Sequence, residues 1–310
     1  MHTKSYIMKR YEKGLVSVII PTYKRTDKLD RAIKSVLGQS YKKIELLLVN
    51  DNVPGDEYTL ALIEKVKAYQ NDSRFQLLLQ EKHINGAVAR NFAIKQAKGE
   101  YIAFLDDDDW WKENKLAEQV KELSLLDEDW GGVSCKMTFY DESMNVISKS
   151  RKYRDGNIYK DILMLQSDVA TGTLLLRHSA LDEAGFFDEN LLRNQDLQLL
   201  VFFTYKFKLK EVDKHLHCVD VSDNQNRASD GYKAITIKEN FYKSVSPILK
   251  TLTKSEMTCV DSMRNFEIAY IFLRGHDYRN AFKYGMSMFR SPKAFYLALS
   301  KIFDRFCCKF

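Results

Sequence analysis

Apolar runs alternate with amphipathic segments along the first third of the chain. Runs with few polar breaks are typical of buried strands, and they predict strands at residues 15–20, 44–49, 75–79 and 101–105. Apolar residues at helical spacing between these runs predict helices over about 29–37, 56–69 and 85–97. Thr26 is a suitable N-cap for the first of these helices. The alternation indicates a parallel, doubly wound sheet.

The pattern is more mixed in the middle of the chain. A helix is expected from about Lys112. Further strands are predicted at 131–140 and 173–176, and further helices near 179–184 and 197–207. From about residue 232 the apolar spacing is helical to the end of the chain. We therefore expect an α/β domain over residues 1–230 and a helical region over residues 231–310.

Polar residues follow three of the predicted strands. The first strand is followed by Pro21, Thr22 and Tyr23, and the second by Asn50-Asp51. The fourth is followed by four consecutive aspartates, Asp106 to Asp109. Ligands of parallel α/β sheets bind beyond the carboxyl ends of the strands. The three segments are therefore expected to meet at one edge of the sheet.

The aspartate quartet needs a physical explanation, because four adjacent carboxylates repel one another. A divalent cation that faces a phosphate supplies one, since Mg²⁺ and Mn²⁺ take oxygen ligands and bridge carboxylates to substrate phosphates. The alternative is a solvated acidic turn that caps the helix expected near Lys112. The convergence of three strand ends favours the cation over the cap.

The bulk composition bounds the class of protein. The chain has 310 residues, of which 45% are hydrophobic and 29% charged, so it can build a sizeable core. It contains no apolar run of membrane-spanning length and no apolar segment of a secretory signal near its start. Five cysteines without a CxxC pair suit a reducing cytoplasm.

The order of several short motifs resembles glycosyltransferase family 2 over about residues 15–230. The motifs are V-S-V-I-I-P-T-Y-K-R, L-V-N-D, A-R-N-F-A-I, Y-I-A-F-L-D-D-D-D-W, G-F-F-D-E and N-Q-D. The resemblance implies the GT-A fold, with a Rossmann-like, mostly parallel sheet. It also implies transfer of a sugar from a nucleotide-sugar donor, with inversion at the anomeric carbon and with Mn²⁺ or Mg²⁺ as cofactor.

By this resemblance, the quartet contains the DxD element of the family. Asp108 would ligate the metal, and Asp106 would lie near the ribose or the metal. Asp107 would support the donor site, and Asp109 would orient the backbone or the acceptor. Helix capping remains the alternative for Asp107 and Asp109.

The resemblance assigns further donor contacts. Asp51 would accept a hydrogen bond from the base, in a pocket lined by Pro21, Thr22 and Tyr23. Arg25 faces either the diphosphate or solvent. His83 either donates to the base or ribose or has no role. Arg90 would pair with phosphate or hold the aspartates in place, and a salt bridge to Asp106 without donor contact is its alternative.

On the acceptor side, the resemblance implies that Asp196 is the general base that deprotonates the incoming hydroxyl. The alternative is that Asp196 caps the helix that follows it. Trp111 would stack on a sugar, while Trp110 is expected to pack inside. Gly172 would allow the backbone to approach the donor sugar closely.

A late loop after the predicted sheet leaves the metal ligation open. Some relatives supply a histidine ligand there, and residues 223–227 of this chain contain none. His215 and His217 lie upstream and are expected to be structural. Arg227 and Ser229 would belong to a segment that closes over the diphosphate.

The basic character of the chain lies at its C-terminal end. Residues 240–310 carry 12 lysines and arginines against 5 acidic residues. The last predicted helix places Phe295, Leu299, Ile302, Phe303, Phe306 and Phe310 on one side, and Lys293, Lys301, Asp304, Arg305 and Lys309 on the other. This pattern suits a membrane surface, a protein contact and packing on the catalytic domain equally well. Nucleic-acid binding is not expected, because no recognition motif accompanies the charge.

The resulting hypothesis is a cytoplasmic, metal-dependent inverting glycosyltransferase that works at the inner face of the cell membrane if the last helix binds lipid. It would add a sugar from a UDP-sugar, the commonest donor class in the family, to a glycan or lipid-linked acceptor in surface polysaccharide synthesis. A non-catalytic nucleotide-sugar-binding or scaffold protein is the first alternative, against which Asp108 and Asp196 argue. A nucleotidyltransferase is the second, although residues 21–25 lack its usual glycine-rich loop.

Overall fold

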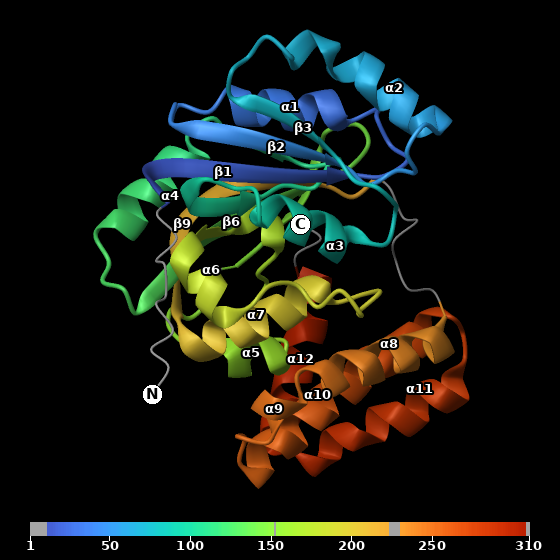
Figure 1. Cartoon of the computed structure of the whole chain (residues 1–310). Helices are drawn as coiled ribbons and strands as arrows, with labels where there is room; N and C mark the ends of the chain where they lie inside the picture. The colour runs from blue at the N-terminus through green and yellow to red at the C-terminus, as the bar shows by residue number, and fades with distance from the viewer. Residues whose placement is uncertain (1–10, 152, 223–229, 308–310) are drawn as a thin grey trace, which may run out of the picture.

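Figure 1 shows the computed structural model of the chain, which describes residues 11–151, 153–222 and 230–307 and gives only the backbone of residues 304–307. In these residues one nine-stranded sheet has the order β3-β2-β1-β4-β8-β6-β9-β5, with β7 paired to β6. The expected loop residues Arg227 and Ser229, and the side chains of Phe306 and Phe310, lie outside the described part.

The first half of the sheet is parallel, as the sequence predicted. Its strands are β1 (Glu12–Thr22), β2 (Ile44–Asn50), β3 (Phe75–Leu79) and β4 (Gly99–Phe104). Parallel pairing places Thr22 opposite Asn50, and Ile19 opposite Phe104. The carboxyl ends of β1, β2 and β4 therefore lie side by side.

The second half of the sheet is mixed. Its strands are β5 (Trp110–Trp111), β6 (Trp130–Tyr140), β7 (Val146–Lys149), β8 (Leu175–Arg177) and β9 (Lys208–Asp220). β8 is antiparallel to both β4 and β6, whereas β9 is parallel to β6 and antiparallel to β5. A short 3₁₀ turn, η2 (Thr171–Thr173), occupies the beginning of the strand that was expected at 173–176.

The helices of the α/β part follow the predicted order, except that α5 was not predicted. They are α1 (Leu29–Leu37), α2 (Glu57–Val66) with η1 (Lys67–Tyr69), α3 (Gly86–Ile94), α4 (Lys115–Ser124), α5 (Tyr159–Leu163), α6 (His178–Ala184) and α7 (Gln195–Lys206). The expected cap at Thr26 is wrong, because α1 begins after Lys28 without a side-chain cap. Capping by the quartet is also wrong, because β5 intervenes and Asn114 precedes α4.

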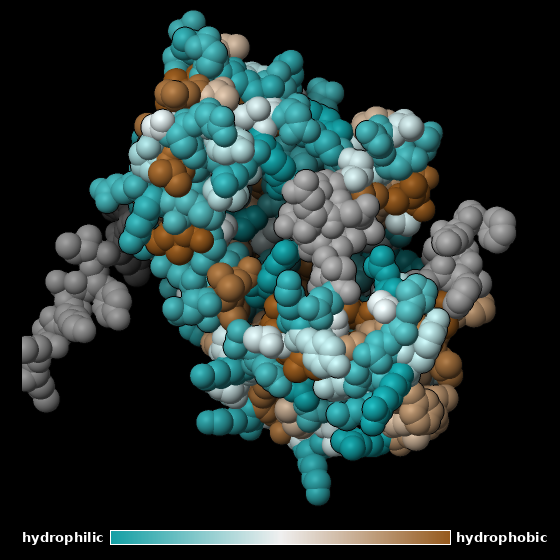
Figure 2. Space-filling view, turned by 90° about the vertical axis from the view of Figure 1, so that its right-hand side faces the viewer, coloured by the Kyte–Doolittle hydropathy of each residue, from teal (hydrophilic) through white to brown (hydrophobic). Residues whose placement is uncertain are grey.

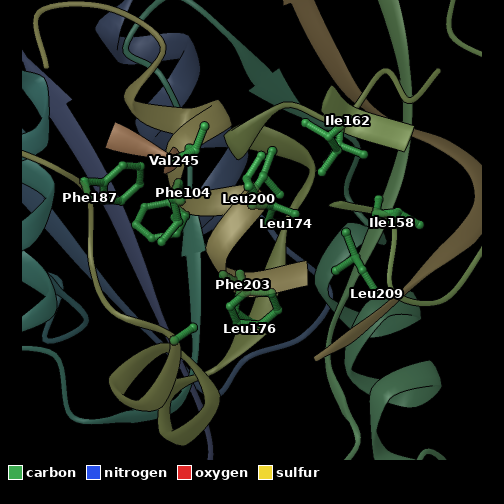
Figure 3. Packing of buried hydrophobic residues seen from close by; sticks show 14 of the residues in the cluster. Phe104, Ile158, Ile162, Leu174, Leu176, Phe187, Leu200, Phe203, Leu209 and Val245 are labelled. Carbon is green, nitrogen blue, oxygen red and sulfur yellow. The ribbon is translucent and has the colours of Figure 1, made fainter. Parts of the chain in front are cut away.

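The strand alternation divides the core between the two faces of the sheet. Val18 of β1 and Leu46 of β2 pack with α1, α2 and α4 on one face. Ile19 and Phe104 face the other side, where α3, α6 and α7 lie (Figure 1). Figure 3 shows this second cluster from nearby, with Phe104 against Phe187 and with Leu200 and Phe203 of α7 beside them.

The C-terminal part is helical, as predicted. It comprises α8 (Gly231–Ser244), α9 (Ser246–Leu249), α10 (Lys254–Arg274), α11 (Tyr278–Gly285), η3 (Met286–Arg290) and α12 (Pro292–Cys307). These helices group below α5 and α7 (Figure 1). Val245 and Met263 belong to the same buried cluster as Phe104 (Figure 3 labels Val245). The core is continuous across residue 230, and the division into two domains there stays a prediction.

Candidate active site

The three strand ends meet in the structure as the sequence predicted. The backbone N–H of Asp51 donates to the carbonyl of Thr22 at 3.0 Å, which joins the ends of β2 and β1. The Thr22 hydroxyl donates to Asp107 Oδ2 at 2.7 Å, which joins the end of β1 to the quartet after β4. The sheet therefore brings Thr22, Asp51 and Asp107 to one edge.

Asp51, His83 and Tyr23 form one cluster at this edge. Asp51 is 3% exposed, and His83 Nδ1 lies 3.2 Å from Asp51 Oδ2. The His83 ring stacks on Tyr23 with a centroid distance of 3.8 Å. Burial raises the pKa of Asp51, while the neighbouring His83 and the backbone N–H of Ile84 act in the opposite direction. Pro21 lies half-buried directly before Thr22.

Asp106 faces a different partner from the rest of the quartet. Arg90 of α3 donates through Nη2 to Asp106 Oδ1 at 2.6 Å. Asp106 keeps 43% of its side chain exposed, whereas Arg90 is 15% exposed. The salt bridge that sequence reasoning offered for Arg90 is therefore present, and Asp106 still has an open side.

Asp107 and Asp108 share the guanidinium of Arg25. Arg25 Nη2 lies 3.1 Å from Asp107 Oδ1, and Nη1 lies 2.7 Å from Asp108 Oδ2. Burial raises the pKa of Asp107 to about 7 and that of Asp108 to about 6, while Arg25 lowers both. Arg25 therefore faces the quartet, and solvent is not its main contact.

Asp109 points away from this group and supports the backbone. It accepts a hydrogen bond from the N–H of Asp220 at 2.9 Å, and His217 Nε2 lies 3.2 Å from its other oxygen. His217 is 1% exposed. A side chain at Gly172 would place its Cβ 2.5 Å from the His217 ring. Glycine is therefore required at position 172, because the His217 ring occupies the space that a side chain would need.

The expected arrangement of the two tryptophans is reversed in the structure. Trp111 is 3% exposed, its indole N–H donates to the carbonyl of Gly172, and Lys115 lies over its ring. Trp110 is half-buried, with Arg31 4.0 Å above its ring. The physical reason is β5, in which successive residues point to opposite faces. Of the pair, Trp110 is the ring with access to a ligand.

Asp196 lies in the first turn of α7. Asn194, which directly precedes this helix, has a left-handed backbone conformation (φ 61°). Burial raises the pKa of Asp196, while the backbone N–H of Leu197 and the charge of Arg90 lower it. Arg90 is thus close enough to act on Asp196 as well as on Asp106. Asn194, and not Asp196, occupies the N-cap position of α7, while the Asp196 carboxylate lies beside backbone N–H groups of the first turn.

Asn91 holds the preceding G-F-F-D-E segment against α3. Its amide donates to the carbonyl of Phe187 and to Glu189 Oε1, both at 2.9 Å, and it accepts from the N–H of Phe187. Phe187 packs edge-on against Phe104, the last residue of β4. These contacts fix the segment before α7, and with it the start of the helix that carries Asp196, against α3 and the end of β4.

Sequence reasoning missed a charged cluster beside the quartet. Asp220, at the end of β9, accepts from Lys28 at 3.1 Å and from Arg31 at 2.7 Å, and Arg31 also donates to the carbonyl of Asp108. With Arg25 these cations recur every third residue, a spacing that could have shown a shared face. They line a cavity of about 590 Å³ that reaches Asp107 and Asp108.

The donor set at the end of β4 fits a hard divalent cation. Among the described residues no group of three or more His, Cys, Asp or Glu side chains could hold a metal ion. Mg²⁺ usually binds one or two carboxylates and takes its other ligands from substrate phosphates and water. Asp106 and Asp108 supply that number of carboxylates.

Comparison with known sequences identifies the family. "Glycosyl transferase family 2" matches residues 17–184, which is more than half of the chain. An uncharacterized glycosyltransferase of Rickettsia prowazekii, RP339, is 29% identical over 281 residues, which cover 88% of this chain and 84% of that protein. The Escherichia coli UDP-Glc:alpha-D-GlcNAc-diphosphoundecaprenol beta-1,3-glucosyltransferase WfaP is 41% identical over 107 residues, which cover 34% of this chain and 40% of WfaP.

Solved structures show the same fold at low sequence identity. S. aureus TarS 1-349 in complex with UDP-GlcNAc has a TM-score of 0.57 and 16% identity, over 89% of this chain and 91% of that one. The Pyrobaculum calidifontis mannosyltransferase PcManGT, in complex with GDP-Man and Mn²⁺, has a TM-score of 0.59 and 16% identity, over 93% and 80%. The chain therefore belongs to glycosyl transferase family 2, and it is a glycosyltransferase with the GT-A fold.

Proposed function

We propose that this enzyme transfers a sugar from a UDP-sugar to a hydroxyl group of a glycan or lipid-linked acceptor, with inversion at the anomeric carbon. One relationship carries the proposal: Arg90 pairs with Asp106 at 2.6 Å and also acts electrostatically on Asp196. The charge of one arginine thus acts on a donor-side carboxylate and on a half-buried carboxylate of another element. Two carboxylates on different elements, one open to solvent and one with a raised pKa, suit the two halves of a displacement reaction.

The nucleotide is assigned to the ends of β1 and β2. Asp51 would accept from the base, with Pro21, Thr22 and Tyr23 around it. His83, held between Tyr23 and Asp51, would turn its free edge to the base or ribose. The complexes of TarS with UDP-GlcNAc and the UDP-Glc in the name of WfaP support a uridine nucleotide.

The diphosphate is assigned to the quartet and its arginines. Asp108 and Asp106 would hold Mn²⁺ or Mg²⁺, and Arg25 and Arg90 supply fixed positive charge beside them. A bound cation would stabilise the charge on the departing diphosphate. Asp107 is held by Thr22 and Arg25 and would support this arrangement without contacting the metal.

Asp196 is assigned the role of general base. It would take the proton of the acceptor hydroxyl while that oxygen forms its bond to the anomeric carbon. The bond from the anomeric carbon to the donor phosphate breaks on the opposite face, and its electron pair leaves with the nucleoside diphosphate. General bases of this kind contribute roughly 10²–10⁴-fold in rate.

The acceptor is assigned to surface polysaccharide synthesis at the inner face of the cell membrane. The lipid-linked acceptor in the name of WfaP supports this class of acceptor. Trp110, half-buried beside Arg31, replaces Trp111 as the ring that would stack on a sugar. No helix in the described ranges is long and apolar enough to cross a bilayer.

Substitution of the base tests the proposal. Asp196→Asn should abolish sugar transfer, measured as release of UDP with acceptor present, and should leave the Kd for UDP within a few-fold of wild type. Asp188→Asn is the matched control. Asp188 lies eight residues before Asp196 and accepts a hydrogen bond from the N–H of Asn190. Transfer at the wild-type rate by Asp196→Asn would refute the assignment.

A further inference from the structure

The C-terminal helices expose a large apolar surface on three successive elements. The α11 residues Tyr278 and Phe282 are 64% and 70% exposed, and Phe289 of η3 is 69% exposed. On α12 the exposed apolar residues are Phe295, Tyr296, Leu299, Ile302 and Phe303. Figure 2 shows tan and brown residues on the right of the lower part of the molecule, next to a largely teal surface. The apolar surface is therefore broader than the single helix face that the sequence indicated.

A groove of about 1120 Å³ runs through this surface. Its walls come from α10, α11, η3 and α12, and Ser148 of β7 lines it from the α/β part. On α11 the lining residues Tyr278, Ala281, Phe282 and Gly285 recur at helical spacing and so form one face. Ser148, the two tyrosines Tyr270 and Tyr278, and the backbone at Gly285 supply the polar atoms of the lining. All other lining side chains are hydrocarbon or thioether. An extended peptide would find few partners for its N–H and C=O groups there, whereas a hydrocarbon chain needs none.

The charge of the same segment is strongly positive. Residues 271–303 contain six lysines and arginines and a single acidic residue, Asp277. The Asp277 carboxylate already accepts from the N–H of Asn280 as the cap of α11. Arg279 and Lys283 flank Phe282 along α11, and Arg290 follows Phe289; all three cations are exposed. Cations beside exposed aromatic residues match an anionic surface with an apolar interior.

We propose that α10, α11, η3 and α12 form a docking surface for an anionic phospholipid bilayer. The groove takes a lipid hydrocarbon chain, and Arg279, Lys283, Arg290 and Lys293 face the headgroups. The negative surface potential of an anionic bilayer attracts Lys and Arg residues that lie near the surface. The surface thus extends beyond α12 to α10, α11 and η3.

The β6–β7 hairpin relates this surface to the active site. Ser148 lines the groove, and Met144 in the same hairpin lines the cavity beside Asp108. Four residues span at most about 14 Å. A bilayer on the helical surface would therefore present a lipid-linked acceptor near the donor edge. Only this last step rests on the proposed function, because bilayer binding itself involves no sugar transfer.

Co-sedimentation with vesicles tests the inference on the full chain. The vesicles are phosphatidylcholine alone, and phosphatidylglycerol with phosphatidylcholine in equal parts. Wild type should bind the mixed vesicles and release them as salt rises. Phe282→Glu with Phe289→Glu should lose binding, and Lys283→Glu with Arg290→Glu should weaken it by about 30-fold or more. Leu60→Glu and Leu125→Glu, at residues 61% and 76% exposed elsewhere on the molecule, should bind like wild type.

Folding and self-association are measured on the same samples. Unchanged melting temperatures and UDP affinities establish that the variants are folded, and size-exclusion chromatography reports their oligomeric state. Equal binding of wild type to both kinds of vesicle would overturn the inference, as would unchanged binding of the two double variants. If wild type forms dimers and binds no vesicles, and the Phe282→Glu, Phe289→Glu variant is monomeric, the surface contacts a second copy of the chain instead of a bilayer.

Discussion

Arg90 Nη2 lies 2.6 Å from Asp106 Oδ1, and the charge of the same guanidinium lowers the pKa of Asp196. Arg90 comes from α3, Asp106 from the end of β4 and Asp196 from the start of α7. The charge of one part-buried guanidinium thus acts on carboxylates from two otherwise separate elements, and it forms an ion pair with Asp106. In the proposed mechanism, one of them serves the donor and the other the acceptor.

Removal of the Arg90 charge should lower the rate of sugar transfer strongly and the stability of the fold only slightly. We expect Arg90→Gln to lower kcat/KM by about 10²-fold, comparable to the loss of one preorganised electrostatic contact in other enzymes. Arg90→Lys should recover part of this loss, because it keeps the charge without the planar fork. Arg154→Gln is the control, since Arg154 is 77% exposed. Steady-state kinetics with a UDP-sugar measure the effect, and near-wild-type turnover by Arg90→Gln would contradict it.

The pH profile should report the surroundings of Asp196. Burial raises the pKa of this carboxyl, and a general base must be ionised to act. We expect kcat/KM to fall as pH decreases through a pKa above the ordinary aspartate value of about 3.9. Arg90→Gln should move this acid limb to still higher pH, because Arg90 favours the charged form. If the acid limb has the same pKa in Arg90→Gln as in wild type, Arg90 does not act on the titrating group.

Gly172→Ala should disturb the quartet through His217. The new Cβ would lie 2.5 Å from the His217 ring, so the ring must leave its place beside Asp109. We expect lower stability and lower kcat/KM, both partly restored by adding His217→Ala, which makes room for the methyl group. Gly285→Ala is the matched control, because its Cβ would approach no neighbour closer than 4.0 Å. Additive effects of the two substitutions would rule out this coupling.

Lys115 should make stability depend on pH in a characteristic way. It is fully buried over Trp111, and burial lowers its pKa from 10.5 to about 8. Between pH 8 and 10.5 the unfolded chain therefore binds more protons than the folded chain, so stability rises with pH in that window. Below pH 8 the free-energy cost of burying the charged lysine is fully present. The shift corresponds to on the order of 3 kcal/mol.

Lys115→Met isolates this contribution, because it removes the charge and keeps a long apolar side chain over Trp111. Its free energy of unfolding, relative to that of wild type, should be higher at pH 7 than at pH 10.5 by roughly that amount, because the methionine variant lacks the cost of burying the charge. Urea unfolding at several pH values measures the difference. A constant difference between the two proteins would show that Lys115 is not the titrating group.

The parallel half of the sheet could be predicted because β1, β2 and β4 are buried on both faces and their sequences are nearly continuous apolar runs. Its strand ends then had to converge, which brought Thr22, Asp51 and the quartet together. The tryptophan pair could not be ordered from sequence, because a two-residue strand has no periodicity of its own. Pairing of Trp111 with His217 in β9 decides which ring is buried.

Long-range contacts explain the other differences. Asp220 pairs with Lys28 and Arg31, which lie far away along the chain, and nothing local to Asp220 signals them. The burial of Lys115 was not predicted, because it depends on the packing of α4 against β6 and β9. The role of Gly172 likewise required the position of His217, which only the folded sheet fixes.

The central claim is that the aspartates after β4 bind a nucleotide diphosphate together with a divalent cation, and thermal unfolding tests it most directly. UDP with Mn²⁺ should raise the melting temperature of wild type by more than the sum of the two effects measured separately. A ligand at 100 times its Kd stabilises the native state by about 2.7 kcal/mol, which corresponds to several degrees. Asp108→Asn should lose the Mn²⁺-dependent part, and Asp161→Asn should keep it. A UDP response that is indifferent to Mn²⁺, or unchanged in Asp108→Asn, would contradict the claim.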